Sequence, residues 1–136
     1  MQVFLSYSPS DESLATRVRS ALEESGLQVW DASRDILPGD NWAEHISEAL
    51  KHSEAMVVLL TQSSVQSPWV QREIEYALGN PAYAKRLIPV LAGDPETFPQ
   101  EKIPWILNRL SMVSLPEADG TDEEIRKIAQ LLKEAA

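Results

Sequence analysis

The chain has 136 residues, 43% hydrophobic and 24% charged, which fits one globular domain with one core and argues against disorder. Its net charge of −9, from 12 basic and 21 acidic residues, excludes nucleic acid as the main ligand, although one arginine or helix N-terminus can still hold a small phosphorylated ligand. Without cysteine, the chain has neither disulfides nor thiolate metal ligands.

The N-terminus leads directly into the short apolar segment 3–5, with no basic region and no long hydrophobic run. We therefore expect neither a signal peptide nor a membrane anchor. The two histidines, His45 and His52, cannot form a catalytic zinc site without carboxylates from elsewhere, and we expect both to be exposed on one helix. The sequence predicts a single cytoplasmic domain, residues 1–136, without a metal site.

The predicted elements begin with a strand at residues 3–5. Apolar side chains then recur at helical spacing between Ser10, an N-cap candidate, and Gly26, a C-cap candidate. Residues 27–30 predict a second strand. The polar residues 31–40 that follow predict a loop.

The middle of the chain predicts a helix, a buried strand and another helix. Trp42, Ile46 and Leu50 belong to the apolar stripe of the second helix. Residues 55–60 form an apolar run without alternation, which is typical of a strand buried on both faces of a parallel sheet. A third helix is predicted over residues 64–78.

The last third of the chain predicts two strands and two helices. Residues 86–91 predict a fourth strand, 94–99 a proline-rich loop and 103–110 a short helix. Residues 112–115 predict a short fifth strand. The sequence Thr-Asp-Glu-Glu at 121–124 is a capping box that predicts the start of the last helix.

Strands that alternate with helices predict an α/β three-layer sandwich with helices on both faces of a parallel sheet. Five such units suggest the flavodoxin-like strand order 2-1-3-4-5, in which a ligand crevice opens between the first and third strands. The segments at this crevice are residues 6–10 and 61–68, so we expect the functional site there.

Three motifs, in this order, resemble the Toll/interleukin-1 receptor (TIR) family. Phe-Leu-Ser-Tyr at 4–7 is similar to the family's first box, and Arg-Asp-Ile-Leu-Pro-Gly at 34–39 to the R-D-x-x-P-G of the loop after strand two. Ser-Pro-Trp-Val-Gln-Arg-Glu at 67–73 is similar to the S-x-W-x-x-x-E that opens the third helix. The last box, usually phenylalanine-tryptophan, keeps only its tryptophan, Trp105.

The resemblance implies two different functions. Some TIR domains are scaffolds for signalling complexes, and others split NAD+ between nicotinamide and ribose with a helix glutamate that Glu73 matches. In the enzymatic case NAD+ is a substrate and no cofactor or metal is needed; the products are nicotinamide and ADP-ribose, or a cyclic ADP-ribose. The resemblance also implies activation by self-association and a role in signalling or defence.

One carboxylate can suffice for this reaction, because nicotinamide leaves as a neutral molecule and the remaining sugar resembles an oxocarbenium ion. Helical spacing puts Trp69 and Glu73 on one face, beside a core stripe that contains Val70 and Ile74, and puts Glu75 on the opposite side. The alternative interpretation of Glu73 is a surface glutamate that favours the helix dipole.

The predicted substrate-binding residues lie near the crevice: Ser6, Tyr7, Asp31, Arg34, Trp42 and Trp69. Ser6 and Tyr7 can hold a ribose or phosphate, or merely cap the strand end. Arg34 can bind a phosphate bidentately, or pair with Asp31 or Asp35. Trp42 is either a core residue or a ring that stacks on the ligand.

The loop 31–41 is the predicted contact with other TIR domains, since Leu37 is an apolar tip beside the Pro38-Gly39 turn. A non-enzymatic scaffold that uses this loop is the alternative function. The residues of this chain exclude a receiver domain, because Ser6-Tyr7 and Thr61-Gln62 occupy the positions where a receiver requires acidic residues. A sensor domain or partner protein outside this chain is compatible with either function.

Overall fold

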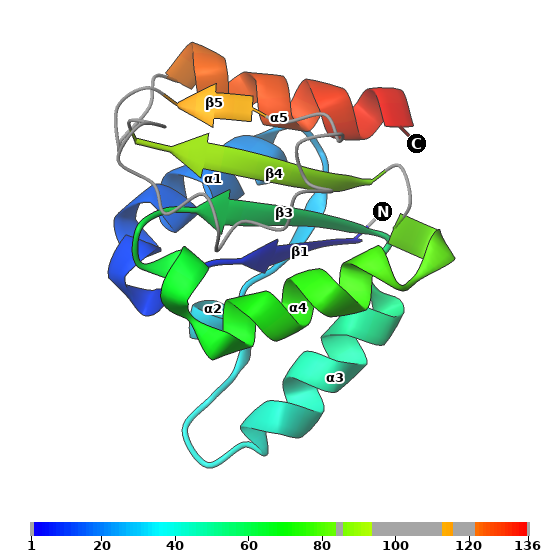
Figure 1. Ribbon diagram of the computed structural model, residues 1–136. Helices are drawn as coiled ribbons and strands as arrows, with labels where there is room; N and C mark the ends of the chain where they lie inside the picture. Colours follow the sequence, from blue (N-terminus) through cyan, green and yellow to red (C-terminus); the bar gives the residue numbers. More distant parts are fainter. Residues whose placement is uncertain (1, 84–85, 94–112, 116–121, 136) are drawn as a thin grey trace.

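Five parallel strands form one sheet in the order β2-β1-β3-β4-β5 in the computed structural model, which describes residues 2–83, 86–93, 113–115 and 122–135 (Figure 1). The predicted fold class and strand order are confirmed. The strands are β1 Gln2–Ser6, β2 Gln28–Trp30, β3 Ala55–Leu60, β4 Leu87–Ala92 and β5 Val113–Leu115. The predicted loop 94–99, the helix 103–110 and Thr121 of the capping box lie outside the described residues.

Helices cover both faces of the sheet (Figure 1). Buried side chains of α1 and α5 pack on one face, and those of α3 and α4 pack on the other. The helices are α1 Glu12–Glu24, α2 Ala32–Asp35, α3 Trp42–His52, α4 Pro68–Leu78 and α5 Asp122–Ala135, with short 3-10 turns η1 Pro9–Asp11, η2 Ser64–Gln66 and η3 Pro81–Tyr83. None of the helices in the described part of the chain is both long and apolar enough to cross a bilayer.

The side chains of β1 alternate between the two apolar cores. Val3 and Leu5 face the core beneath α1 and α5, whereas Phe4 faces the core beneath α3 and α4. Every residue of β3 is buried, as its unbroken apolar run predicts. This packing fixes the carboxyl end of β1, where Ser6 pairs in register with Val58 of β3.

Two predicted helix starts were wrong, and proline explains both. Ser10 does not cap α1, because it lies inside the turn Pro9–Asp11 that precedes the helix. The helix predicted over 64–78 is divided into η2 and α4, since a residue before proline disfavours helical geometry. Ser67 is extended, with φ −81° and ψ 120°, and its side chain caps α4 by accepting from Val70 N.

The segment 31–40 is not a simple loop, because it contains the short helix α2. Asp31 is its N-cap, and Asp31 Oδ1 accepts a 3.0 Å hydrogen bond from Ser33 N. Gly39 follows with φ +92°, a conformation that favours glycine. Leu37 is 65% exposed next to this turn, as the sequence predicts.

Candidate active site

A cavity of about 280 Å³ opens at the carboxyl ends of β1 and β2, against α3 and α4. The sequence predicts a crevice between β1 and β3, whereas the described lining includes Trp30 of β2 and no residue of β3. Of the two predicted segments, 6–10 contributes Tyr7 and Pro9, and 61–68 contributes Ser67. The cavity walls are largely aromatic, with Tyr7, Trp30, Trp42 and Trp69 among the lining residues. Two carboxyl side chains, Glu12 and Glu73, also line it, and its described lining contains no lysine or arginine. The cavity therefore favours a flat, positively charged group over a phosphate.

Glu73 lies on the second turn of α4 and is only 8% exposed. Ser6 Oγ, at the end of β1, donates a 2.7 Å hydrogen bond to Glu73 Oε1. Burial raises the pKa of the Glu73 carboxyl to about 7, while the hydrogen bond from Ser6 opposes that rise by favouring the charged form. Glu75 is exposed, as helical spacing predicts, so the two glutamates differ sharply in environment.

Trp42 and Trp69 meet at the edge of the cavity. Their ring centroids are 4.2 Å apart and the ring planes are at 89°, an edge-to-face contact. Trp42 is 43% exposed and Trp69 is 37% exposed, so Trp42 is a wall of the cavity rather than a core residue. The guanidinium carbon of Arg72 lies 5.4 Å from the Trp69 ring centroid.

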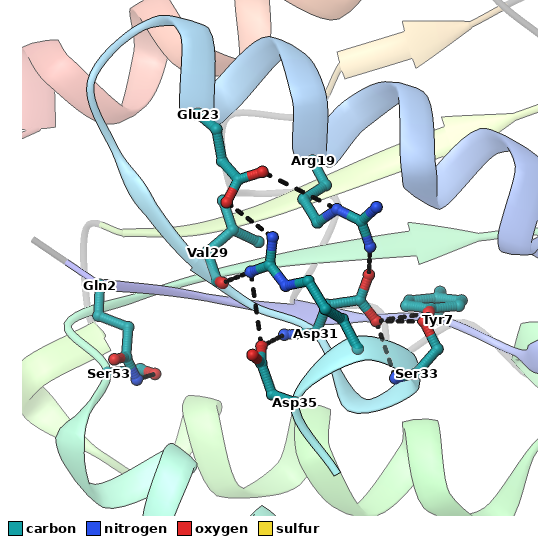
Figure 2. A network of polar contacts seen from close by, with 10 residues as sticks. Gln2, Tyr7, Arg19, Glu23, Val29, Asp31, Ser33, Asp35 and Ser53 are labelled. Carbon is teal, nitrogen blue, oxygen red and sulfur yellow. Dashed lines mark hydrogen bonds and ion pairs between the residues drawn. The ribbon is translucent and has the colours of Figure 1, made fainter. Parts of the chain in front are cut away.

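Tyr7 belongs to a polar network that ties the start of α2 to β1 and α1 (Figure 2). Tyr7 OH donates a 2.6 Å hydrogen bond to Asp31 Oδ1, and its oxygen also lies 2.9 Å from Ser33 Oγ. Arg19 Nη1 donates to Asp31 Oδ2 at 2.6 Å. Burial, followed by the contact with Asp31, raises the pKa of the Tyr7 hydroxyl to about 12, so Tyr7 stays protonated.

Asp31 is 1% exposed and does not belong to the cavity lining. Burial by itself would raise the pKa of Asp31, but the hydrogen bonds from Tyr7, Ser33 and Arg19 together lower it. The Asp31 carboxylate is thus charged, and both of its oxygens accept hydrogen bonds within the fold. A role for Asp31 in binding substrate stays a prediction, and any such effect has to pass through Tyr7 or Ser33.

Arg34 also lies outside the cavity lining. Its Nη1 lies 2.8 Å from Glu23 Oε2, and its Nη2 donates to the carbonyl oxygen of Val29 and lies 3.5 Å from Asp35 Oδ2. The ion-pair interpretation is therefore observed: Arg34 pairs with Asp35, one of the two predicted partners, and with Glu23 instead of Asp31. Binding of a phosphate by Arg34 stays a prediction.

Glu12 was missed in the sequence as a site residue. It begins α1 directly after the turn that follows β1, so the topology brings its side chain to the cavity. The available signal was its position at the strand crossover, where ligands of such sheets bind. The described residues contain no group of three or more acidic or histidine side chains that could hold a metal ion, and His45 and His52 are exposed.

Comparison with known proteins gives one consistent result: a family model described as "TIR domain" matches residues 3–132. The stimulator of interferon genes protein of Magallana gigas is 27% identical over 131 residues, which cover 93% of this chain and 31% of that protein. The NAD(+) hydrolase TcpA of Theionarchaea archaeon (strain DG-70-1) is 26% identical over 133 residues, which cover 96% of this chain and 40% of that protein.

A solved structure shows the same fold. The TIR domain of the Toll-related receptor TRR-2 from Hydra magnipapillata superimposes with a TM-score of 0.71 at 21% identity, covering 98% of this chain and 96% of that one. The chain spans less than half the length of each of the four curated relatives it matches. The shared fold of this domain therefore does not establish the activities that those longer proteins have as a whole.

Proposed function

The chain belongs to the TIR domain family, and from that premise we propose that it is an NAD+ glycohydrolase that cleaves the nicotinamide–ribose bond. One observation carries the proposal: Glu73 is a buried carboxyl at an aromatic cavity, on the face of α4 that also presents Trp69. The likeness to a protein named NAD(+) hydrolase supports it. NAD+ is consumed as a substrate, and no cofactor is part of the proposal.

The cavity suits the cationic half of NAD+. The nicotinamide ring is flat and positively charged, so it fits among tryptophan rings and beside the carboxylates of Glu12 and Glu73. A cavity of about 280 Å³ is at the lower end of the range for ligand pockets, roughly 300–1,000 Å³, so the adenosine half extends beyond it. The diphosphate then meets groups outside the lining, where Arg34 is one candidate.

In the proposed reaction the bond between C1′ of the ribose and the nicotinamide nitrogen breaks, and its electron pair stays on that nitrogen. Nicotinamide therefore leaves neutral without an acid catalyst. The positive charge moves to the ribose, where the Glu73 carboxylate stabilises it directly or as a covalent ester. Water then adds to C1′ and releases a proton to give ADP-ribose, or an atom of the same substrate attacks to give a cyclic product.

A scaffold function is the second candidate, because Leu37 is a large apolar side chain 65% exposed on the loop 31–41. Docking of other TIR domains on this loop is compatible with the enzymatic proposal as its means of activation. In both cases we propose a cytoplasmic role in signalling or defence. A sensor domain or partner outside this chain would supply the trigger.

The deciding experiment is incubation of concentrated protein with NAD+ followed by chromatography of the products. We expect nicotinamide together with ADP-ribose or its cyclic form from the parent protein and from Glu75→Ala, and no products from Glu73→Ala. The melting temperature of each variant shows that it is folded. If the folded parent protein does not cleave NAD+ even when the protein is clustered, the scaffold becomes the preferred function.

A further inference from the structure

Ser6 is the last residue of β1, and its side chain is almost completely buried, at 1% exposure. It does not belong to the cavity lining, and direct binding of substrate by Ser6 stays a prediction. Its Oγ nevertheless reaches Glu73 Oε1 at 2.7 Å, and Glu73 does line the cavity. Pairing with Val58 of β3 fixes the backbone of Ser6. The serine therefore holds the glutamate from the end of a strand that is paired on both sides.

This contact divides the roles of the two carboxylate oxygens. Oε1 accepts from Ser6, whereas Oε2 has no hydrogen-bond partner among the residues that the structure describes. Glu73 itself lines the cavity, so its carboxyl group is placed where a substrate can reach it while Ser6 holds Oε1.

The surroundings of Glu73 offer little else that favours its charge. From the end of β1, the Tyr7 hydroxyl donates to Asp31 instead. From α1, Glu12 contributes a negative charge, and α3 contributes the non-ionisable Trp42 and Ile46. On α4 itself, Arg72 lies over the Trp69 ring. Among the described residues, the hydrogen bond from Ser6 is thus the direct contact that favours a charged Glu73.

We propose that Ser6 is a positioning residue of this site, whose hydrogen bond orients Glu73 toward the cavity and favours its charged form. The inference rests on the proposed function for its catalytic consequence. It predicts that kcat depends on Ser6 whereas KM does not, because in this proposal Ser6 acts through Glu73 from outside the cavity lining. A serine that only stabilised the strand end would change neither the ionisation of Glu73 nor the pH profile.

The test compares Ser6→Ala with Ser6→Thr, which keeps the hydroxyl group. The side-chain carboxyl of Glu73 is followed by ¹³C NMR during a pH titration, with Glu73→Gln to assign its resonance. We expect Ser6→Ala to raise the midpoint of this titration by about one pH unit, because a hydrogen bond to the charged form is lost. The acid limb of the pH profile of kcat/KM should move to higher pH by the same amount in Ser6→Ala, and kcat at pH 6 should fall roughly tenfold. Ser6→Thr should restore both the profile and kcat.

Ser53→Ala is the matched control, because Ser53 is also buried and bonds to Gln2, at the opposite end of β1 (Figure 2). This variant should lose stability without moving the Glu73 titration. If Ser6→Ala does not fold, Ser6→Cys keeps the volume with a weak donor and is measured instead. An unchanged Glu73 midpoint in the folded variant overturns the inference. If Ser6→Ala shifts the Glu73 midpoint but the parent protein never cleaves NAD+, the contact is supported and the proposed function is overturned instead.

Discussion

Trp42 and Trp69 form an edge-to-face pair across two helices, with ring centroids 4.2 Å apart at the edge of the cavity. Each ring lies in the first turn of its own helix, α3 or α4. More than a third of each side chain is exposed, so this pair is a wall that a ligand can reach. The contact also joins the end of the loop 31–41 to the helix that carries Glu73.

The first prediction concerns Trp69. If its ring forms the wall against which the substrate packs, Trp69→Ala should lower kcat/KM at least tenfold while the free energy of unfolding falls by only about 1 kcal/mol, as expected for a partly exposed aromatic. Trp69→Phe should keep part of the activity. Turnover and urea unfolding of the same preparations check this, and unchanged turnover per folded molecule would mean that Trp69 is purely structural.

The second prediction is a pH dependence of stability caused by Glu73. Its pKa rises from the usual 4.5 to about 7 on folding, mainly through burial. Between these values the folded protein keeps a proton that the unfolded chain releases. Stability from this group is therefore complete below pH 4.5 and is lost as the pH rises through 7, a change of about 3 kcal/mol.

Glu73→Gln should remove this dependence, because glutamine has no proton to lose. The variant should match the parent near pH 4.5 and exceed its free energy of unfolding by about 3 kcal/mol at pH 8. Urea unfolding at several pH values measures the difference, with Glu75→Gln as the exposed control. A gap between parent and Glu73→Gln that stays constant with pH would contradict the assignment.

The third prediction concerns Asp31. Its removal leaves the Arg19 guanidinium and the Tyr7 hydroxyl without their partner and deletes the N-cap of α2. Asp31→Ala should therefore destabilise the protein by about 3 kcal/mol, as breaking a buried pair does. Asp40→Ala is the control: the Asp40 carboxylate accepts an exposed hydrogen bond from Leu37 N and lies 3.6 Å from His45 Nε2, and its loss should cost about 0.5 kcal/mol.

A second variant, Asp31→Asn, tests the predicted contact of Asp31 with substrate. Because Asp31 lies behind Tyr7 and Ser33, activity per folded Asp31→Asn molecule should stay within about threefold of the parent at low temperature. Thermal melting provides the folded fraction and initial rates provide the activity. A large rise in KM in a fully folded variant would instead support direct contact with substrate.

The fold was predictable because its signals are local. The unbroken apolar run of β3 and the spacing of Val70 and Ile74 each specify one element, and their alternation specifies the topology. The pairing of Trp69 with Glu73 on one helix face was predictable for the same reason. The start of the third predicted helix was not predictable in this way, because Pro68 outweighs the apolar periodicity around it.

The partners of these side chains were not predictable, because they come from distant parts of the chain. Ser6 and Glu73 are separated by 67 positions, and Arg19 meets Asp31 only because α1 packs beside β2. Sequence spacing gives no information about such pairs without coordinates. The role of Glu12 depends in the same way on where the first crossover places the start of α1.

The last prediction concerns assembly through the loop 31–41. Leu37 is 65% exposed beside the Gly39 turn, whereas a net charge of −9 opposes association, most strongly at low salt. We therefore expect a monomer of low activity in dilute solution, with turnover per molecule that rises roughly tenfold on concentration as association proceeds by mass action. A head-to-tail contact of this kind forms open filaments unless it closes into a ring.

Leu37→Asp should abolish that rise, because it puts a further negative charge on the apolar contact, and it should leave the activity of the dilute protein unchanged. Leu78→Asp is the matched control, since Leu78 is an exposed leucine at the end of α4, 37% exposed. Specific activity is measured across a wide concentration range beside sedimentation of the same samples. If the parent remains a monomer with constant turnover per molecule throughout, the site is complete in one chain and self-association has no part in its activation.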